Sequence, residues 1–162
     1  MTADSPYTDA DQRTRGFYFD ELTIGQVFKS ESRVISEADI ANFASVSGDD
    51  NPVHTDPGFA RRTAFRGCVA HGALSMAVAT GLGWRTGIFV KTLQAIVENN
   101  ARFVGAVRPG DQVRLEIEVA EHEAEPAPKR GHVRMWTRLY NQRDELVVDG
   151  DWLCLFKRNS AD

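Results

Sequence analysis

Apolar and polar residues alternate along two segments in the second half of the chain. The apolar positions, with one threonine among them, are Val113, Leu115, Ile117 and Val119, then Val133, Met135, Thr137 and Leu139. A period of two is typical of strands that bury one face. Further strand-like segments lie at 91–107 and 146–158, and turn-forming residues separate all four. The second half is therefore predicted to be an antiparallel sheet with short connections.

An apolar segment rich in alanine and glycine precedes these strands, from about Gly72 to Trp84. Its small residues permit close packing on all sides, so we predict a buried helix. One long helix followed by antiparallel strands predicts an α+β fold, with the helix laid against a curved sheet.

The first part of the chain is predicted to hold a strand and a shorter helix. Phe28 to Val34 alternates weakly, with Phe28 and Val34 on one shared face. Ser36 and Asp39 have the spacing of a capping box, and Gly48 is a suitable helix end. A helix is therefore expected between Ser36 and Gly48.

Length and composition limit the possible classes of protein. The 162 residues predict a single domain at 17–158, between a flexible tail at 1–16 and a short tail at 159–162. A net charge of −4 argues against nucleic-acid binding. There is no apolar run long enough for a membrane span or a secretory signal. Two isolated cysteines, Cys68 and Cys154, are interpreted as packing residues in a reducing, cytoplasmic setting.

The polar stretch SGDDNPVHTDP, residues 47–57, is the first candidate site. Taken alone it is a turn, because Asp, Asn and Pro are turn formers. Its chemistry also suits general acid–base catalysis, since Asp49 and His54 would be held close on a rigid path. Asn51 would tie the turn or position a substrate. A metal site of His54, Asp56 and His71 is the third reading, but the spacing matches no zinc pattern, and no metal is predicted.

The second candidate lies at the start of the long helix, in VAHGALSMA. Backbone N–H groups at a helix N-terminus are unpaired, and the helix dipole favours negative charge there. Gly72 has no side chain, so a substrate oxygen can approach its N–H, which describes half of an oxyanion hole. The alternative is that Gly72 only allows close packing.

Together, SGDDNPVHTDPGFARRTAF, the spacer RGCVA and HGALSMA resemble the MaoC-like dehydratases, the (R)-specific enoyl-CoA hydratases of hotdog fold. The matching positions are Asp49, Asn51, Pro52, His54, Asp56, Pro57, Thr63, Ala64, Phe65, His71 and Gly72. FDELTIGQVF and VGAVRPGDQVRLEIEV extend the likeness, which covers about residues 17–158.

The resemblance implies a hotdog fold, in which the sheet wraps the central helix, and a homodimer or a larger assembly. It makes Asp49 and His54 the catalytic pair and Gly72 the oxyanion-hole donor. Asn51, His71 and Thr80 are expected to bind or orient the substrate. The implied reaction is hydration of a trans-2-enoyl-CoA thioester or the reverse dehydration of a 3-hydroxyacyl-CoA, without a cofactor.

Two other functions stay open from the sequence. A hotdog thioesterase usually carries a carboxylate on the central helix, and residues 73–83 contain none. A non-catalytic acyl-CoA-binding protein would not need the pair of Asp49 and His54.

Substrate contacts are less determined. The basic residues expected to meet the phosphates of coenzyme A, with simple surface charge as the alternative, are Arg61, Arg62, Arg66, Lys129 and Arg130. Trp84, Phe89 and Leu93 either bound an acyl tunnel or belong to the core.

Overall fold

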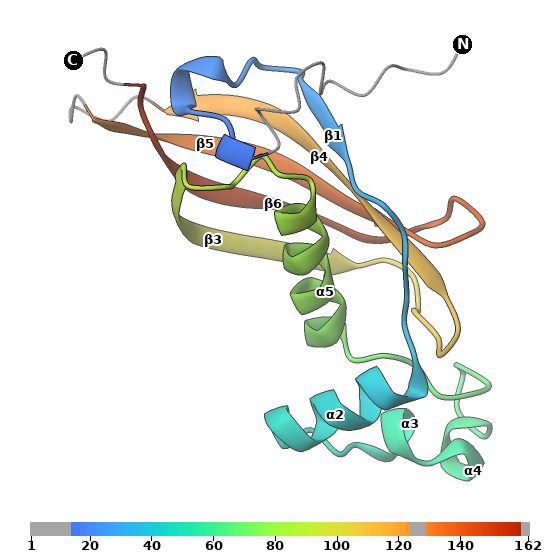
Figure 1. The fold of residues 1–162 in the computed structure, drawn as a ribbon. Helices are drawn as coiled ribbons and strands as arrows, with labels where there is room; N and C mark the ends of the chain where they lie inside the picture. The colour runs from blue at the N-terminus through green and yellow to red at the C-terminus, as the bar shows by residue number, and fades with distance from the viewer. Residues whose placement is uncertain (1–13, 124–128, 160–162) are drawn as a thin grey trace.

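The computed structural model describes residues 14–123 and 129–159. Its elements are η1 (Phe19–Glu21), β1 (Val27–Lys29), β2 (Arg33–Val34), α2 (Glu37–Ser47), α3 (Pro52–Thr55), α4 (Pro57–Ala60), α5 (Gly72–Arg85), β3 (Leu93–Phe103), β4 (Gln112–Glu123), β5 (Arg130–Tyr140) and β6 (Leu146–Lys157). Figure 1 shows α5 lying against one face of a long curved sheet, with α2, α3 and α4 grouped beyond one end of α5.

The sheet is antiparallel and has the order β1-β4-β5-β6-β3, with β2 also pairing with β4. β3 is therefore an edge strand of the single chain. The predicted alternation is confirmed, because Val113, Leu115, Ile117 and Val119 are all at most 1% exposed. Burial of each such side chain contributes roughly 1.5–3 kcal/mol, so the face toward α5 supplies much of the stability.

The prediction of one strand from Phe28 to Val34 was wrong. Two short strands form instead, and Phe28 is fully buried whereas Val34 is 52% exposed, so they do not share a face. Ser30 marks the interruption. Its hydroxyl oxygen accepts the Leu115 N–H at 2.8 Å, in a place where a strand would offer a backbone carbonyl.

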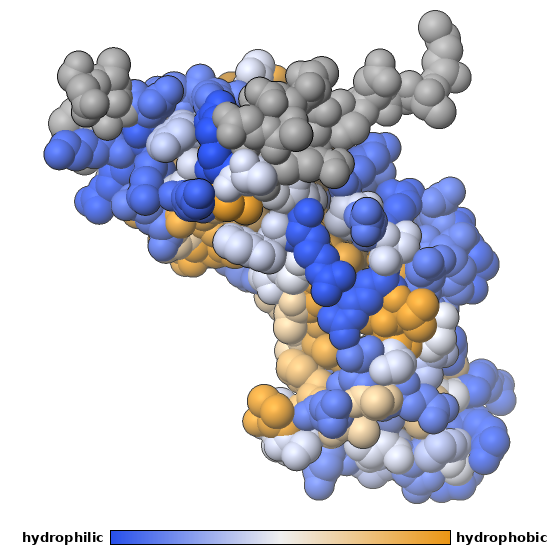
Figure 2. All heavy atoms as spheres, in the orientation of Figure 1, coloured by the Kyte–Doolittle hydropathy of each residue, from blue (hydrophilic) through white to orange (hydrophobic). Residues whose placement is uncertain are grey.

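The long helix is confirmed at Gly72–Arg85, but it is not enclosed on all sides. Leu74, Val78 and Leu82 are buried, whereas Ala73 and Ala77 on the opposite face are exposed. The cause is that one sheet covers only one side of a helix. Figure 2 shows apolar surface gathered along the middle of the molecule on this open side of α5.

The ends of the predicted domain are partly described. Of the predicted tail at 1–16, residues 1–13 lie outside the described residues. Arg15 pairs with Glu21 at 2.7 Å, and the Phe17 N–H donates to the Ile88 carbonyl at 3.0 Å. β4 continues to Glu123 and β5 begins at Arg130, and residues 124–128 between them lie outside the described residues. No helix in the described ranges is long and apolar enough to cross a membrane.

Candidate active site

The helix that leads to the polar stretch, α2, begins with the predicted capping box. The Asp39 N–H donates to the Ser36 hydroxyl at 3.0 Å, and the Ser36 N–H donates to the Asp39 carboxylate at 2.9 Å. The helix ends at Gly48, whose φ of +76° is a left-handed conformation that glycine adopts without strain. The chain therefore changes direction at Gly48, and Asp49 is the first residue after this turn.

Two one-turn helices follow, because each proline occupies a first helical position and none lies inside a helix. Asn51 caps α3 by accepting the Val53 N–H at 3.2 Å. Asp56 caps α4 by accepting the N–H groups of Gly58 and Phe59 at 2.7 and 3.0 Å. The hydrogen bond from the Phe59 N–H, and after it the bond from the Gly58 N–H, holds the pKa of the Asp56 carboxyl below its usual range. Asn51 and Asp56 therefore shape the stretch, as turn chemistry predicts.

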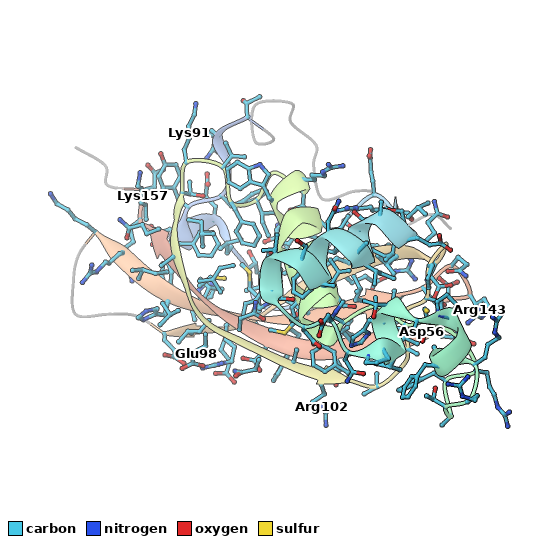
Figure 3. The ribbon with its side chains drawn as sticks, turned by 90° about the horizontal axis from the view of Figure 1, so that it is seen from below. Asp56, Lys91, Glu98, Arg102, Arg143 and Lys157 are labelled. Atoms are coloured by element: carbon cyan, nitrogen blue, oxygen red, sulfur yellow. The ribbon has the colours of Figure 1, made fainter. Side chains whose placement is uncertain are left out.

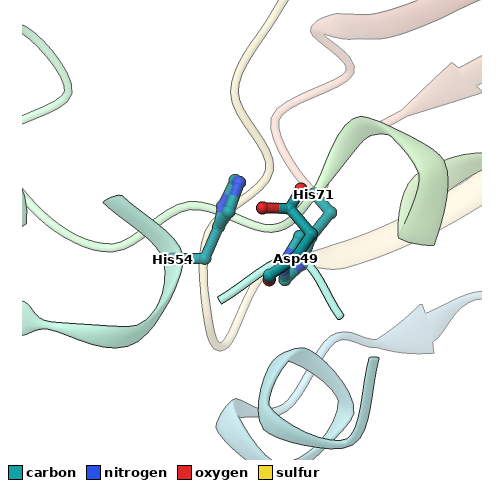
Figure 4. Close-up of side chains that lie close together, drawn as sticks. All are labelled: Asp49, His54 and His71. Atoms are coloured by element: carbon teal, nitrogen blue, oxygen red, sulfur yellow. The ribbon is translucent and has the colours of Figure 1, made fainter. Parts of the chain in front are cut away.

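The structure brings Asp49, His54 and His71 together. Their carboxylate and ring-nitrogen ligand atoms lie within 4.8 Å of one another. Figure 4 shows the Asp49 carboxylate directed toward the ring of His54, with His71 next to Asp49. Asp49 is exposed and His54 is partly exposed, whereas His71 is 2% exposed. The two expected catalytic groups therefore stand side by side on an accessible surface.

One hydrogen bond fixes the tautomer of neutral His54. Its Nδ1 lies 2.8 Å from the Val69 carbonyl oxygen. A carbonyl only accepts, so Nδ1 carries the proton and donates it. The Nε2 atom of neutral His54 then has a lone pair and acts as an acceptor.

Gly72 and His54 line the same pocket, which has a volume of about 460 Å³. Its walls include His54, Gly72 and Ser75, together with Phe65 and Phe103. Gly72 is the first residue of α5, so its N–H has no acceptor within the helix. Gly72, at the N-terminus of α5, and His54 therefore line one pocket.

Gly72 also has a packing role. A Cβ added there would lie 2.7–2.9 Å from the Phe103 ring, closer than real Cβ contacts. The packing alternative raised by the sequence therefore applies, and the same position also lines the pocket.

The geometry favours hydrogen-bonding roles over metal ligation for the two histidines. Their rings are stacked, with centroids 3.8 Å apart and planes inclined by 29°. Lone pairs in nearly parallel planes do not converge on one ion at the ~2 Å of a metal–imidazole bond. His54 Nδ1 and His71 Nε2 already face carbonyl oxygens. Asp56, the third residue of the metal reading, caps α4.

Other predicted contacts lie elsewhere. Thr80 is eight residues after Gly72, about 12 Å along the helix, and its hydroxyl donates to the Ala77 carbonyl at 2.7 Å. Phe89 is 3% exposed and packs on Trp152 and Phe156, so it belongs to the core. Trp84 is 56% exposed. None of these three borders the pocket beside His54.

The basic residues divide into two groups. Arg61, Arg62 and Arg66 follow α4 on the segment that contains Phe65, which lines the pocket. Arg130 pairs in the sheet with Lys157, and Figure 3 shows Lys157 at the opposite end of the molecule from Asp56. In a single chain only the first group is on the side of the site.

The two cysteines also differ. Cys154 is fully buried, and this burial raises the pKa of its thiol to about 12, which agrees with a packing role. Cys68 is partly exposed and borders a second pocket of about 240 Å³, which His54 also lines.

Sequence reasoning missed Phe103 and the segment after it, Val104 to Val107, which form one wall of the pocket. A strand-like segment was expected here, but its end has no chemical motif. The signal available was an aromatic residue just before VGAVRPGD, at the point where the strand leaves the sheet. The contacts of the His71 ring were also missed, because they join residues far apart in sequence.

Comparison with known proteins identifies the family. The model of the MaoC-like domain matches residues 20–137, most of the chain. The chain belongs to this family. It is 32% identical over 156 residues to a 3-hydroxybutyryl-CoA dehydratase of Methylorubrum extorquens, spanning 91% of this chain and 90% of the relative. It is 33% identical over 132 residues to an (R)-specific enoyl-CoA hydratase of Aeromonas caviae, spanning 80% and 92%.

The fold has solved counterparts as well. A Mycobacterium tuberculosis protein described as a double hotdog fold matches with a TM-score of 0.74 and 25% identity. The match covers 91% of this chain and 46% of that one. The predicted hotdog fold, with an antiparallel sheet around one long helix, is confirmed.

Proposed function

We propose that this protein adds water to trans-2-enoyl-CoA thioesters to give (R)-3-hydroxyacyl-CoA, and catalyses the reverse dehydration. The observation that carries the proposal is the shared pocket, which Gly72, the first residue of α5, lines together with His54, with the Asp49 carboxylate beside His54. Relatives named as a hydratase and a dehydratase of CoA thioesters support it.

The thioester carbonyl would sit at the start of α5. A hydrogen bond from Gly72 N–H and the positive end of the helix dipole would stabilise the enolate-like oxygen that forms when water adds. Gly72 has no Cβ, and the Phe103 ring occupies the space where one would be. The N–H is therefore preorganised in an apolar wall, where a hydrogen bond to developing charge is strong.

Asp49 and His54 would hold one water between them. Asp49 accepts one hydrogen of the water, and Nε2 of His54 accepts the other, because Nδ1 is already used as a donor to Val69. The water oxygen bonds to C3 as its proton moves to Asp49. This proton then passes from the Asp49 carboxyl, by way of Nε2 of His54, to C2. Atoms balance as the net addition of H₂O, so no cofactor is required.

We also propose that the protein forms a homodimer. Within the described part of the chain β3 pairs only with β6 and is an edge strand, and edge strands are templates for pairing. Val97 on this strand is 53% exposed, and the uncovered face of α5 also needs a partner. A homodimer through β3 would cover apolar surface that one sheet leaves open.

The direct test is a panel of 2-enoyl-CoA thioesters of different chain length and branching. Loss of the conjugated enoyl absorbance, with an (R)-3-hydroxyacyl product, is the expected result. An (S)-product would contradict the assigned geometry. Release of free coenzyme A would indicate a thioesterase, and thermal stabilisation by acyl-CoA without turnover on any thioester would indicate a binding protein.

A further inference from the structure

His71 is the motif residue whose side chain the reaction above does not use. It occupies the N-cap position of α5, yet its side chain makes no capping hydrogen bond. Serine, threonine, aspartate or asparagine would cap this helix better. The start of the helix therefore does not account for a buried histidine at this position.

The one hydrogen bond found for the His71 ring ends on Asp49. Nε2 lies 2.9 Å from the backbone carbonyl oxygen of Asp49, 22 residues away in sequence. The carbonyl can only accept, so Nε2 carries the proton. The other nitrogen, Nδ1, is buried and has no partner among the described residues. A single directional contact thus ties the first turn of α5 to the residue that carries the proposed base.

The ring of His71 also packs against the second member of the pair. It is stacked on the His54 ring at 3.8 Å, and the Phe43 ring of α2 lies 5.1 Å from it. With the Nδ1–H of His54 bonded to Val69, this stack leaves His54 little freedom to rotate. One buried side chain therefore contacts both Asp49 and His54.

We propose that His71 is a positioning residue for the pair. This inference rests on the proposed function, and it adds a role for a residue that would not touch the reacting atoms. The Nε2–H of His71 fixes the backbone of Asp49, and hence the place of its carboxylate, relative to Gly72 one residue away. The face of the ring sets the plane of His54. Small displacements of catalytic groups have large effects on rate, so the contacts of His71 with Asp49 and His54 should control turnover.

Two substitutions separate the two contacts. His71→Gln keeps an N–H donor at a similar reach and loses the ring, whereas His71→Phe keeps a ring and leaves the Asp49 carbonyl without its donor. Thr86→Val is the matched control, since it removes a buried side-chain hydrogen bond, 2.6 Å from Thr86 to the Gly83 carbonyl, at the other end of α5.

The expected kinetic result concerns kcat more than KM. His71→Phe should lower kcat by roughly 10–100-fold, with KM within about threefold of wild type, because geometry is lost and not the binding surface. His71→Gln should recover most of this loss, and Thr86→Val should keep wild-type kcat. If His71→Phe keeps kcat within about twofold of wild type, or if Thr86→Val loses as much as His71→Phe, the proposal is overturned.

Ring-nitrogen NMR gives a readout that does not depend on activity. In the wild-type protein, His71 should carry its proton on Nε2 and His54 on Nδ1. His71→Phe should change the His54 nitrogen signals, whereas Thr86→Val should leave them unaltered. The opposite tautomer of His71, or unchanged His54 signals in His71→Phe, overturns the inference. If wild-type protein hydrates no thioester, the proposed function fails, and the NMR result alone decides whether His71 positions His54.

Discussion

Gly72 shows how one residue serves packing and chemistry together. Its missing side chain lets the Phe103 ring lie against the start of α5, and the residue lines the pocket beside His54, where its N–H is the proposed oxyanion-hole donor. The sequence predicted the open N–H from the position of a glycine at a helix start. The contact of Phe103 with Gly72 was not predicted, because the two residues are far apart in sequence and meet only in the folded chain.

Gly72→Ala should destabilise the protein by about 1–3 kcal/mol, because the new methyl group overlaps the Phe103 ring. Removing the ring with Phe103→Ala should cancel most of this cost. A double-mutant cycle of urea unfolding measures the coupling between the two positions. The interpretation is contradicted if Gly72→Ala costs as much in the Phe103→Ala background as in wild type.

At the scale of elements, α2 was predictable because its signals are local. Ser36, Asp39 and Gly48 lie within the helix or beside it, and the capping box and left-handed end form as expected. The single strand predicted at 28–34 failed because Ser30 bonds the β4 backbone with its side chain, a tertiary contact that short-range alternation does not reveal. The same limit explains why the open face of α5 was not foreseen.

The capping box also predicts a pH dependence. The N–H and hydroxyl of Ser36, together with Arg33, hold the pKa of the Asp39 carboxyl below its usual 3.8. A lowered folded-state pKa gives stability that is present above the unfolded pKa and is lost as the pH falls through the folded value. Asp39→Asn should therefore lower the melting temperature at pH 7, and the difference from wild type should shrink below about pH 4.

Glu37→Gln is the control for this measurement. It removes a carboxylate from the same first turn but leaves both bonds of the capping box intact. Its effect on the melting temperature should be small. A gap between Asp39→Asn and wild type that stays constant from pH 7 to pH 3 would refute the assigned role of the Asp39 carboxylate.

For the whole molecule, the order of hydrophobic patterns fixed the α+β class, and the motif residues fixed the family. The proximity of the set was predictable, since His54 and Gly72 line one pocket and Asp49 lies beside His54. The interior of the pocket was not, because Phe65, Phe103 and Val148 come from three separate segments. The sequence also does not distinguish Arg61 from Arg130 as a phosphate contact, whereas the fold puts Arg61 on the side of the site and Arg130 toward the opposite end of the molecule.

The proposed dimer predicts a specific effect of charge on β3. Val97→Lys places a charge on an exposed edge strand and should halve the mass measured by light scattering. Val46→Lys is the matched control, because Val46 is 87% exposed on α2 and should leave the mass unchanged. A mass for Val97→Lys equal to that of wild type would exclude pairing through this part of β3.

Hydration by variants of the proposed pair tests the central claim most directly. With the best thioester of the panel, Asp49→Asn and His54→Ala should each lower kcat/KM by roughly 10²–10⁴-fold, as expected for loss of an acid–base group. Both should keep the wild-type circular dichroism spectrum. Asp50→Asn, at a neighbour that is also exposed, should retain full turnover. Wild-type kcat/KM in both Asp49→Asn and His54→Ala would contradict the account.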